Sequence, residues 1–285
     1  MTASAPVPLH EVDPSLSDAD FAALARMVQK HLGIRMPDDK RSLVVQRMRA
    51  PLARAGCRTF REWAGRNMDH GLTPEVLSVL ADALTTNHTA FWREPAHFEH
   101  LRDKTLPELV RNRSRNKDVR LWCAASATGE EPWQLAMLLR DGLPADWQGG
   151  LLATDVSAKA LNAARDGRYD AGRLSSLPEN WRKKWIEPLP DGGGRIRAEL
   201  RADITFRRLN LLHGPWAFKK PFDVIFCRNV LIYFEPPVRD SVVTHLVQSL
   251  APGGTLYVGH SESLPNKFGL RQLGTSTWMK PGGPS

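Results

Sequence analysis

The chain has 285 residues, of which 42% are hydrophobic and 25% are charged, and its formal net charge is +8. This hydrophobic content excludes a disordered chain. No apolar run reaches the roughly 18 residues that a membrane span needs, and residues 1–20 lack the features of a signal peptide. Three widely spaced cysteines exclude a disulfide framework and predict a reduced, cytoplasmic protein. The positive charge favours an acidic partner.

The first part of the chain predicts a small all-helical domain, residues 15–88, after a Pro- and Ala-rich N-terminus, residues 1–14, that we expect to be disordered. No strand pattern interrupts the helical spacing of its apolar residues. Pro51 is expected to kink or restart its helix. Helices are expected to begin at Ser17 and to cover 38–55, 59–67 and 74–87.

The remainder, residues 89–285, alternates apolar runs with helical segments, which predicts a parallel, doubly wound α/β sheet. One segment, residues 181–208, breaks the alternation and predicts a small antiparallel β-subdomain inserted in the sheet domain. The expected strands are 119–125, 151–156, 203–210, 222–228 and 254–260, with a closing edge strand at 271–280, and the expected helices are 130–141, 157–166 and 237–250.

Ligands of open α/β sheets bind beyond the carboxyl ends of the strands, so the residues there are candidates. Small residues and Gly129 follow the first strand, then Glu130 and Glu131 open a helix, and Asp155 follows the second strand 26 residues after Gly129. That offset is typical of an acidic residue that binds a ribose, but the full glycine fingerprint of dinucleotide sites is missing. The two glutamates could also be ordinary helix N-terminal acids, and Asp155 could be a helix cap.

Six short blocks in order carry a resemblance to a known family. They are NHTAFWRE (87–94), TGEEPW (128–133), ATD (153–155), NLL (210–212), IFCRNVLIYF (225–234) and GHSE (259–262). Together they resemble the chemotaxis receptor methyltransferase family, CheR, from about residue 17 to residue 278. The resemblance implies an N-terminal all-helical domain, a Rossmann-like sheet that binds S-adenosylmethionine (SAM) and a small antiparallel β-subdomain.

The resemblance also implies the site. Glu131 and Asp155 would take the methionine amino group and the ribose hydroxyls of SAM between them, and Arg93 and Tyr233 would lie beside the reacting methyl group as catalytic residues. His88 and Trp92 depart from the usual family residues without removing a polar contact. The implied contacts to SAM, or to its product S-adenosylhomocysteine, are Asn87, Thr89, Arg93, Glu131, Asp155, Asn210, Leu211, Arg228 and Asn229.

Other interpretations of these residues stay open. Arg93 could stack on Trp92 or pair with Glu94 at the surface, and Tyr233 could be a core tyrosine. The histidines show no ligand spacing in the sequence, so no metal is expected, and His260 has no assigned role.

Residues 40–66 carry many basic residues against a single acid, Glu62. A charge run is usually a solvated face, but one of a single sign fits an acidic partner. Lys40, Arg47 and Arg54 are spaced by seven and share a face if their helix is continuous. We expect Lys40, Arg47, Arg54 and Arg58 to dock the substrate.

The function implied by the resemblance is O-methylation of glutamate side chains in chemoreceptor cytoplasmic helices, by in-line transfer without a general base. It predicts the receptor cytoplasmic domain as partner, no nucleic acid, no membrane insertion and a monomer. Two alternatives are an RNA methyltransferase, which lacks a recognisable RNA-binding motif here, and a non-catalytic SAM-binding adaptor, which intact Arg93 and Tyr233 disfavour.

Overall fold

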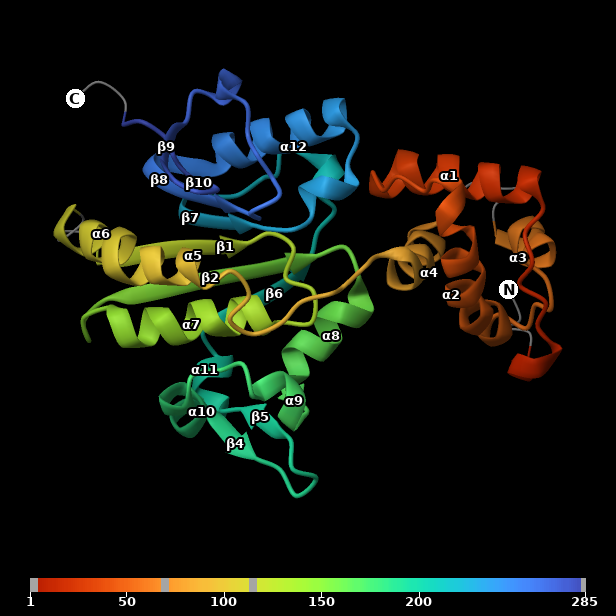
Figure 1. Cartoon of the computed structure of the whole chain (residues 1–285), viewed down its shortest axis with the longest axis horizontal. Helices are drawn as coiled ribbons and strands as arrows, with labels where there is room; N and C mark the ends of the chain where they lie inside the picture. Colours follow the sequence, from red (N-terminus) through yellow and green to blue (C-terminus); the bar gives the residue numbers. More distant parts are fainter. Residues whose placement is uncertain (1–4, 68–71, 113–116, 283–285) are drawn as a thin grey trace. The chain divides into compact units, whose positions relative to one another are not determined.

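The computed structural model describes residues 5–67, 72–112 and 117–282, and it divides into two compact units (Figure 1). The helical unit contains the residues up to Thr86 together with Tyr233–Glu235. The sheet unit contains the remaining residues, 87–232 and those from 236 onward. Within the described residues, every helix is too short or too polar to cross a membrane.

The helical unit packs four α-helices around a small apolar core. Ser17 begins the first helix as expected, because its side chain accepts a hydrogen bond from the backbone nitrogen of Asp20. Val28, Met48 and Leu80 from three different helices are fully buried. The elements are η1 (Leu9–Glu11), α1 (Asp18–Leu32), η2 (Asp38–Lys40), α2 (Arg41–Arg54), α3 (Phe60–Asn67) and α4 (Pro74–Leu84).

The expectation of disorder for residues 1–14 is wrong for the part that the structure describes, residues 5–14. Val12 is buried, and the backbone nitrogen of Val7 donates to the carbonyl oxygen of Ala53 at 3.0 Å. Burial of an apolar side chain and satisfied backbone groups offset the entropy that ordering this segment costs. Residues 1–4 lie outside the described residues.

Pro51 does not restart its helix, and the other expected effect, a kink, stays a prediction. α2 runs continuously from Arg41 to Arg54 with Pro51 inside it. The fixed φ of proline is compatible with a helix, so the cost is the missing N–H donor and the crowding of the preceding turn. Burial of Pro51, and of Met48 and Leu52 beside it, works against that cost.

The sheet unit contains the parallel strands that the alternation predicts, as part of a sheet of seven described strands in the order β6-β2-β1-β7-β8-β10-β9. The neighbours from β6 to β8 are parallel, and β10 is antiparallel to both β8 and β9. The expected single edge strand at 271–280 is a hairpin instead, because Ser276 adopts a positive φ of 54° and reverses the chain. The strands are β1 (Asp118–Cys123), β2 (Gln148–Asp155), β6 (Ile204–Arg208), β7 (Phe222–Cys227), β8 (Leu250–Val258), β9 (Arg271–Gly274) and β10 (Thr277–Met279).

Helices between these strands cover a core of buried aromatic and aliphatic side chains. Trp133, Phe226 and Tyr257 are fully buried in this core. The main helices are α5 (Pro95–His100), a π-helical turn η3 (Leu101–Thr105), α6 (Leu106–Asn112), α7 (Glu130–Gly142), α8 (Ala158–Asp166) and α12 (Pro236–Ser249), and shorter turns are η4 (Leu211–His213), η5 (Leu231–Tyr233) and η6 (Asn266–Phe268).

A small antiparallel sheet lies apart from the seven strands (Figure 1). Its range differs from the expected 181–208. It begins at β3, and the residues of β6 belong to the main sheet, where they pair with β2. Alternating side chains alone do not show which sheet a strand joins. The elements are β3 (Arg168–Tyr169), α9 (Ala171–Leu174), α10 (Glu179–Trp185), β4 (Ile186–Pro188), β5 (Gly194–Ile196) and α11 (Ala198–Arg201).

Candidate functional site

The candidate site lies at the carboxyl ends of β1, β2 and β7. β1 lies between β2 and β7: from β1 the chain continues to β2 and later to β6 on one side, and then crosses to β7 on the other side. This is the switch point at which open α/β sheets bind their ligands. Loop 125–129 follows β1, Asp155 ends β2, and Arg228 and Asn229 follow β7.

Gly129 allows the loop after β1 to pass close to α8. Its φ is 101°, a conformation that L-residues with a side chain rarely adopt. A Cβ at this position would lie 2.8 Å from the Cβ of Ala164 and 2.9 Å from the hydroxyl oxygen of Tyr169. The loop therefore requires glycine for two reasons, its backbone conformation and its close packing.

The two adjacent glutamates that open α7 have different surroundings. Glu130 is fully buried, accepts a hydrogen bond from the Thr128 hydroxyl at 2.8 Å and forms an ion pair with Arg173. Burial raises the pKa of Glu130 despite these contacts. Its side chain thus stabilises the loop, and Glu131 is the one that reaches Arg228 after β7.

Asp155 joins the loop after β1 to the start of α8. One of its carboxylate oxygens accepts from the backbone nitrogen of Ala127 at 2.9 Å, and the other accepts from the backbone nitrogen of Ser157 at 2.9 Å. The side chain that caps α8 is that of Ser157, which accepts from Ala160. The carboxylate of Asp155 therefore holds two loops of the site in place, and the helix cap that it could have formed is provided by Ser157.

Arg228 is the centre of a buried ionic cluster. Its side chain is 1% exposed and contacts Glu131 at 2.6 Å and Glu94 at 2.9 Å, and it donates to the backbone oxygen of Arg93 at 2.6 Å. Burial disfavours the charged guanidinium, but the two carboxylates outweigh it and raise the pKa of Arg228. Burial also acts to raise the pKa of Glu94, but hydrogen bonds from Asn229 and Arg228 and the charge of Arg228 lower it to about 2.

Asn229 connects this cluster to the end of β8. Its side-chain nitrogen donates to Glu94 at 3.0 Å, and its backbone nitrogen donates to Glu262 at 2.7 Å. Its φ is 57°, in the left-handed region that asparagine tolerates. Glu262 also accepts from the backbone nitrogen of Gly259 at 2.6 Å, and burial raises the pKa of its carboxyl group. These contacts fix the loop after β7 from both sides.

Family models match almost the whole chain. Residues 19–85 match the all-alpha domain of CheR methyltransferase, and residues 87–279 match its SAM binding domain. The chain belongs to the CheR methyltransferase family. The predicted family and fold class are thereby confirmed, and the junction between the two matches lies at the boundary of the two units.

Curated relatives agree with this assignment. A probable chemotaxis protein methyltransferase of Rhizobium etli is 38% identical, over 88% of this chain and 96% of the relative. The chemotaxis protein methyltransferase of Escherichia coli is 35% identical, over 90% of both chains. That of Borreliella burgdorferi is 32% identical, over 93% of this chain and 95% of the relative.

Arg93 makes neither of the pairings that the sequence left open, as far as the described residues show. Its guanidinium donates to the carbonyl oxygen of His88 at 2.9 Å. Glu94 pairs with Arg228 instead, and the Trp92 ring stacks on Phe98 with centroids 5.8 Å apart. The half-buried guanidinium of Arg93 therefore has a backbone partner but no carboxylate among these residues.

Tyr233 groups with the helical unit. Its backbone oxygen accepts from the nitrogen of Arg35 at 3.2 Å, and the next residue, Phe234, forms a β-bridge with Ile34. Each unit is described by itself, so the predicted place of Tyr233 beside Arg93 stays a prediction.

The remaining predicted cofactor residues line the same strand ends or the segment before Arg93. Asn210 follows β6, where its side-chain oxygen accepts from the backbone nitrogen of Leu212 at 3.0 Å, and Leu211 is buried. Asn87 and Thr89 are partly exposed and precede Arg93 in the sheet unit. Their predicted contacts to SAM stay predictions.

The basic face of the helical unit is less uniform than its sequence indicates. Arg47 donates to the carbonyl oxygens of Leu84 and Thr85 at 3.3 and 3.0 Å, and Arg58 pairs with Glu11 at 2.9 Å. Lys40 and Arg54 are exposed. Arg47 therefore has a structural role at the end of α4, which the heptad spacing alone did not indicate.

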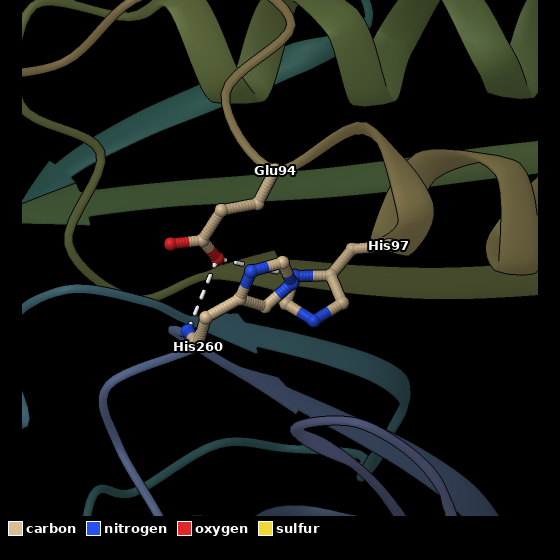
Figure 2. Close-up of side chains that lie close together, drawn as sticks. All are labelled: Glu94, His97 and His260. Atoms are coloured by element: carbon tan, nitrogen blue, oxygen red, sulfur yellow. Dashed lines mark hydrogen bonds and ion pairs between the residues drawn. The ribbon is translucent and has the colours of Figure 1, made fainter.

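The structure also brings together residues that the sequence analysis did not connect. Potential ligand atoms of Glu94, His97 and His260 all lie within 4.8 Å of one another (Figure 2). Glu94 and His97 are three positions apart at the start of α5, a helical spacing that could have been noticed. His260 is 163 positions further along the chain, and only the fold shows that it belongs to this group.

Proposed function

We propose that the chain transfers the methyl group of SAM to glutamate side chains in the cytoplasmic domain of chemoreceptors and forms glutamyl methyl esters. The observation that carries this proposal is the cluster of Glu131, Arg228 and Glu94, together with Asp155 at the end of β2, at the switch point of a CheR-family sheet. Its relatives are named chemotaxis protein methyltransferases, which indicates the substrate class.

The residues at this edge of the sheet fit SAM. The cofactor offers an ammonium group and ribose hydroxyls, which are hydrogen-bond donors, and the site offers the carboxylates of Asp155 and Glu131 as acceptors. Arg228 compensates part of this negative charge and fixes the orientation of Glu131. The SAM cofactor supplies an activated methyl group on a sulfonium.

The proposed chemistry needs no general base. The nucleophile is a glutamate carboxylate, which is ionised at neutral pH because its reference pKa is about 4.3. A carbon–oxygen bond forms while the carbon–sulfur bond breaks, and the sulfur keeps the electron pair as a neutral thioether. No proton moves in this step, so positioning of the two reactants supplies the catalysis.

Arg93 is proposed to hold the incoming carboxylate, because its guanidinium is partly exposed and pairs with no acid among the described residues. Tyr233 is proposed to line the path of the methyl group. The exposed Lys40 and Arg54 are proposed to attract the acidic receptor helix, with Arg47 and Arg58 contributing less because they already have partners.

The test is transfer of tritiated methyl from SAM to a panel of purified receptor cytoplasmic domains, with RNA as the control substrate. We expect label in a receptor and none in RNA. We also expect the single-turnover rate of methyl transfer to change little between about pH 6.5 and 8.5. Label in RNA alone would overturn the proposal that the receptor is the substrate. A histidine-like limb near pH 6.5 that disappears in a His260→Ala variant would overturn the mechanism without a base.

A further inference from the structure

Glu94, His97 and His260 form a compact group in the sheet unit, next to the buried ionic cluster (Figure 2). Glu94 is the residue at which α5 begins, His97 lies on its first turn, and His260 follows β8. One carboxylate oxygen of Glu94 lies 3.5 Å from the Nδ1 atom of His97 and 3.3 Å from the backbone nitrogen of His260.

The imidazole of His97 lies between two oxygen atoms that can only accept hydrogen bonds. Its Nε2 atom is 3.4 Å from the carbonyl oxygen of Thr275, and its Nδ1 atom faces the ionised carboxylate of Glu94. The side chain is 2% exposed, and Nδ1 has no hydrogen-bond partner among the described residues. In its neutral form the ring has one proton for two acceptors, so one nitrogen presents a lone pair to an oxygen.

A bound metal ion removes this conflict. With the proton on Nε2 and directed to Thr275, the lone pair of Nδ1 and an oxygen of Glu94 converge on one point. A ring N–H on a carbonyl with the other nitrogen on a metal is the usual arrangement of a metal-bound histidine. Tetrahedral zinc with bonds of 2.0–2.1 Å separates its ligand atoms by about 3.3 Å, and the Nδ1 to Glu94 oxygen distance is 3.5 Å.

The surrounding charges do not oppose a cation. Arg228 contributes one positive charge, and its two partners Glu94 and Glu131 contribute two negative charges. The Glu94 oxygen that faces His97 accepts from Arg228 at 2.9 Å and from the backbone nitrogen of His260 at 3.3 Å, so an ion bound there would replace the longer of these two contacts and leave the contact to Arg228. His260 is exposed, and its ring lies 4.9 Å from that of His97 between centroids, so a small movement brings it into the coordination sphere.

We propose that a carboxylate oxygen of Glu94, the Nδ1 atom of His97 and a ring nitrogen of His260 bind a divalent transition-metal ion of the Zn²⁺ type, with water as a further ligand. Two imidazole donors and one carboxylate select zinc and its neighbours over Mg²⁺ and Ca²⁺, which prefer oxygen ligands only. The site shares Glu94 with the ionic cluster at the switch point, but metal binding is measured without methyl transfer, so it does not depend on the proposed function.

The test uses the full chain, freed of metal, and Zn²⁺ alone in competition with a chromophoric chelator. We expect one Zn²⁺ per chain, and loss of affinity by at least about tenfold in His97→Gln and in His260→Ala. Matched controls are His100→Gln, a histidine of the same helix whose ring bonds the Tyr257 hydroxyl at 2.9 Å, and His213→Ala, an exposed histidine elsewhere in the unit. Both controls should bind Zn²⁺ as the parent does.

Co²⁺ in place of Zn²⁺ gives a second readout, because its visible absorption reports nitrogen and oxygen ligands in a tetrahedral or five-coordinate site. Because His260 is exposed, its alanine variant keeps the test decisive even if His97→Gln does not fold. Absence of stoichiometric Zn²⁺ binding, unchanged affinity in His260→Ala, or displacement of Co²⁺ by millimolar Mg²⁺ would overturn the proposal.

Discussion

At the scale of single residues, Arg228 determines how the site is held together. It is the buried cation that two partly buried carboxylates, Glu94 and Glu131, share. Removal of one member of a buried ion pair leaves its partners charged and without compensation, which typically costs about 3–5 kcal/mol. The cluster therefore holds the residues of the site in place, and this arrangement depends on Arg228.

The first prediction concerns Arg228→Met, a substitution of similar length without charge. We expect the free energy of unfolding to fall by about 3–5 kcal/mol in urea denaturation, because both carboxylates lose their cation. The matched control is Arg102→Met, whose guanidinium pairs with the neighbouring Asp103 at the surface and should matter by less than about 1 kcal/mol. Equal effects of the two substitutions would contradict the buried cluster.

The second prediction concerns Asp155→Ala. Loss of an acceptor for a bound hydroxyl or ammonium costs about 1–3 kcal/mol, so the affinity for SAM and for S-adenosylhomocysteine should fall about tenfold or more in calorimetry. Ser157→Ala is the control, because it removes the cap of α8 without removing the carboxylate. It should lower stability and leave cofactor affinity unchanged. The same affinity in Asp155→Ala as in the parent chain would exclude Asp155 from the site.

The choice between a binding role and an ordinary helix-terminal role for Glu131 and Asp155 came from the family resemblance. Position at a strand end only marked them as candidates, because the rule for parallel sheets places such residues at one edge. It could not find Glu94, which lies before α5 and reaches Arg228 only in the folded chain. It also could not show that, of the adjacent pair Glu130 and Glu131, the first is fully buried in the loop and the second reaches Arg228. That distinction depends on Arg173 and Thr128, which arrive from other parts of the fold.

At the scale of elements, α2 shows that a run of one charge can have two roles. Arg47 and Arg54 are seven positions apart on one continuous helix, as the spacing predicts. The first is turned to the end of α4, where it bonds two carbonyl oxygens, and the second is exposed. Cations near a helix C-terminus satisfy its free carbonyl groups and are stabilising.

The third prediction separates these roles. Arg54→Glu should raise the KM for the receptor and weaken its salt dependence, without a change in stability or cofactor affinity, because it reverses an exposed charge. Arg47→Ala should instead lower the free energy of unfolding of the helical unit by about 1–3 kcal/mol, because charged hydrogen bonds are lost. Kinetics at low and moderate salt and urea denaturation measure the two effects. An unaltered KM in Arg54→Glu would show that this basic face is a solvated surface without a part in docking the receptor.

The sequence predicted the parallel strands of the main sheet and the helices that connect them, but not the limits of the small sheet. Strand β6 was expected both as a main strand and as part of the β-subdomain, and only its pairing with β2 assigns it to the main sheet. Strand β3 has two residues, Arg168 and Tyr169, which is too short for a periodic pattern to appear in the sequence. The hairpin near Ser276 was missed because a serine at positive φ has no reliable signature.

At the scale of the whole molecule, the division into two units matches the division of labour that we propose. The sheet unit contains the residues that are predicted to contact SAM, and the helical unit contains the basic residues that are proposed to attract the receptor. The formal net charge of +8 accords with attraction of an acidic receptor helix. Of the two residues that the family implies at the reacting centre, Arg93 belongs to the sheet unit and Tyr233 groups with the helical unit.

The methyl acceptor that we propose is a glutamate carboxylate of a chemoreceptor. The most direct measurement is mass spectrometry of a receptor cytoplasmic domain after incubation with the enzyme and SAM, before and after mild alkali. We expect a single-methyl mass increase on peptides that contain glutamate, its removal by alkali as expected for an ester, and an Arg93→Ala variant whose methyl transfer falls further than its affinity for SAM. An alkali-stable methyl group, or one located on any residue other than glutamate, would contradict this proposal.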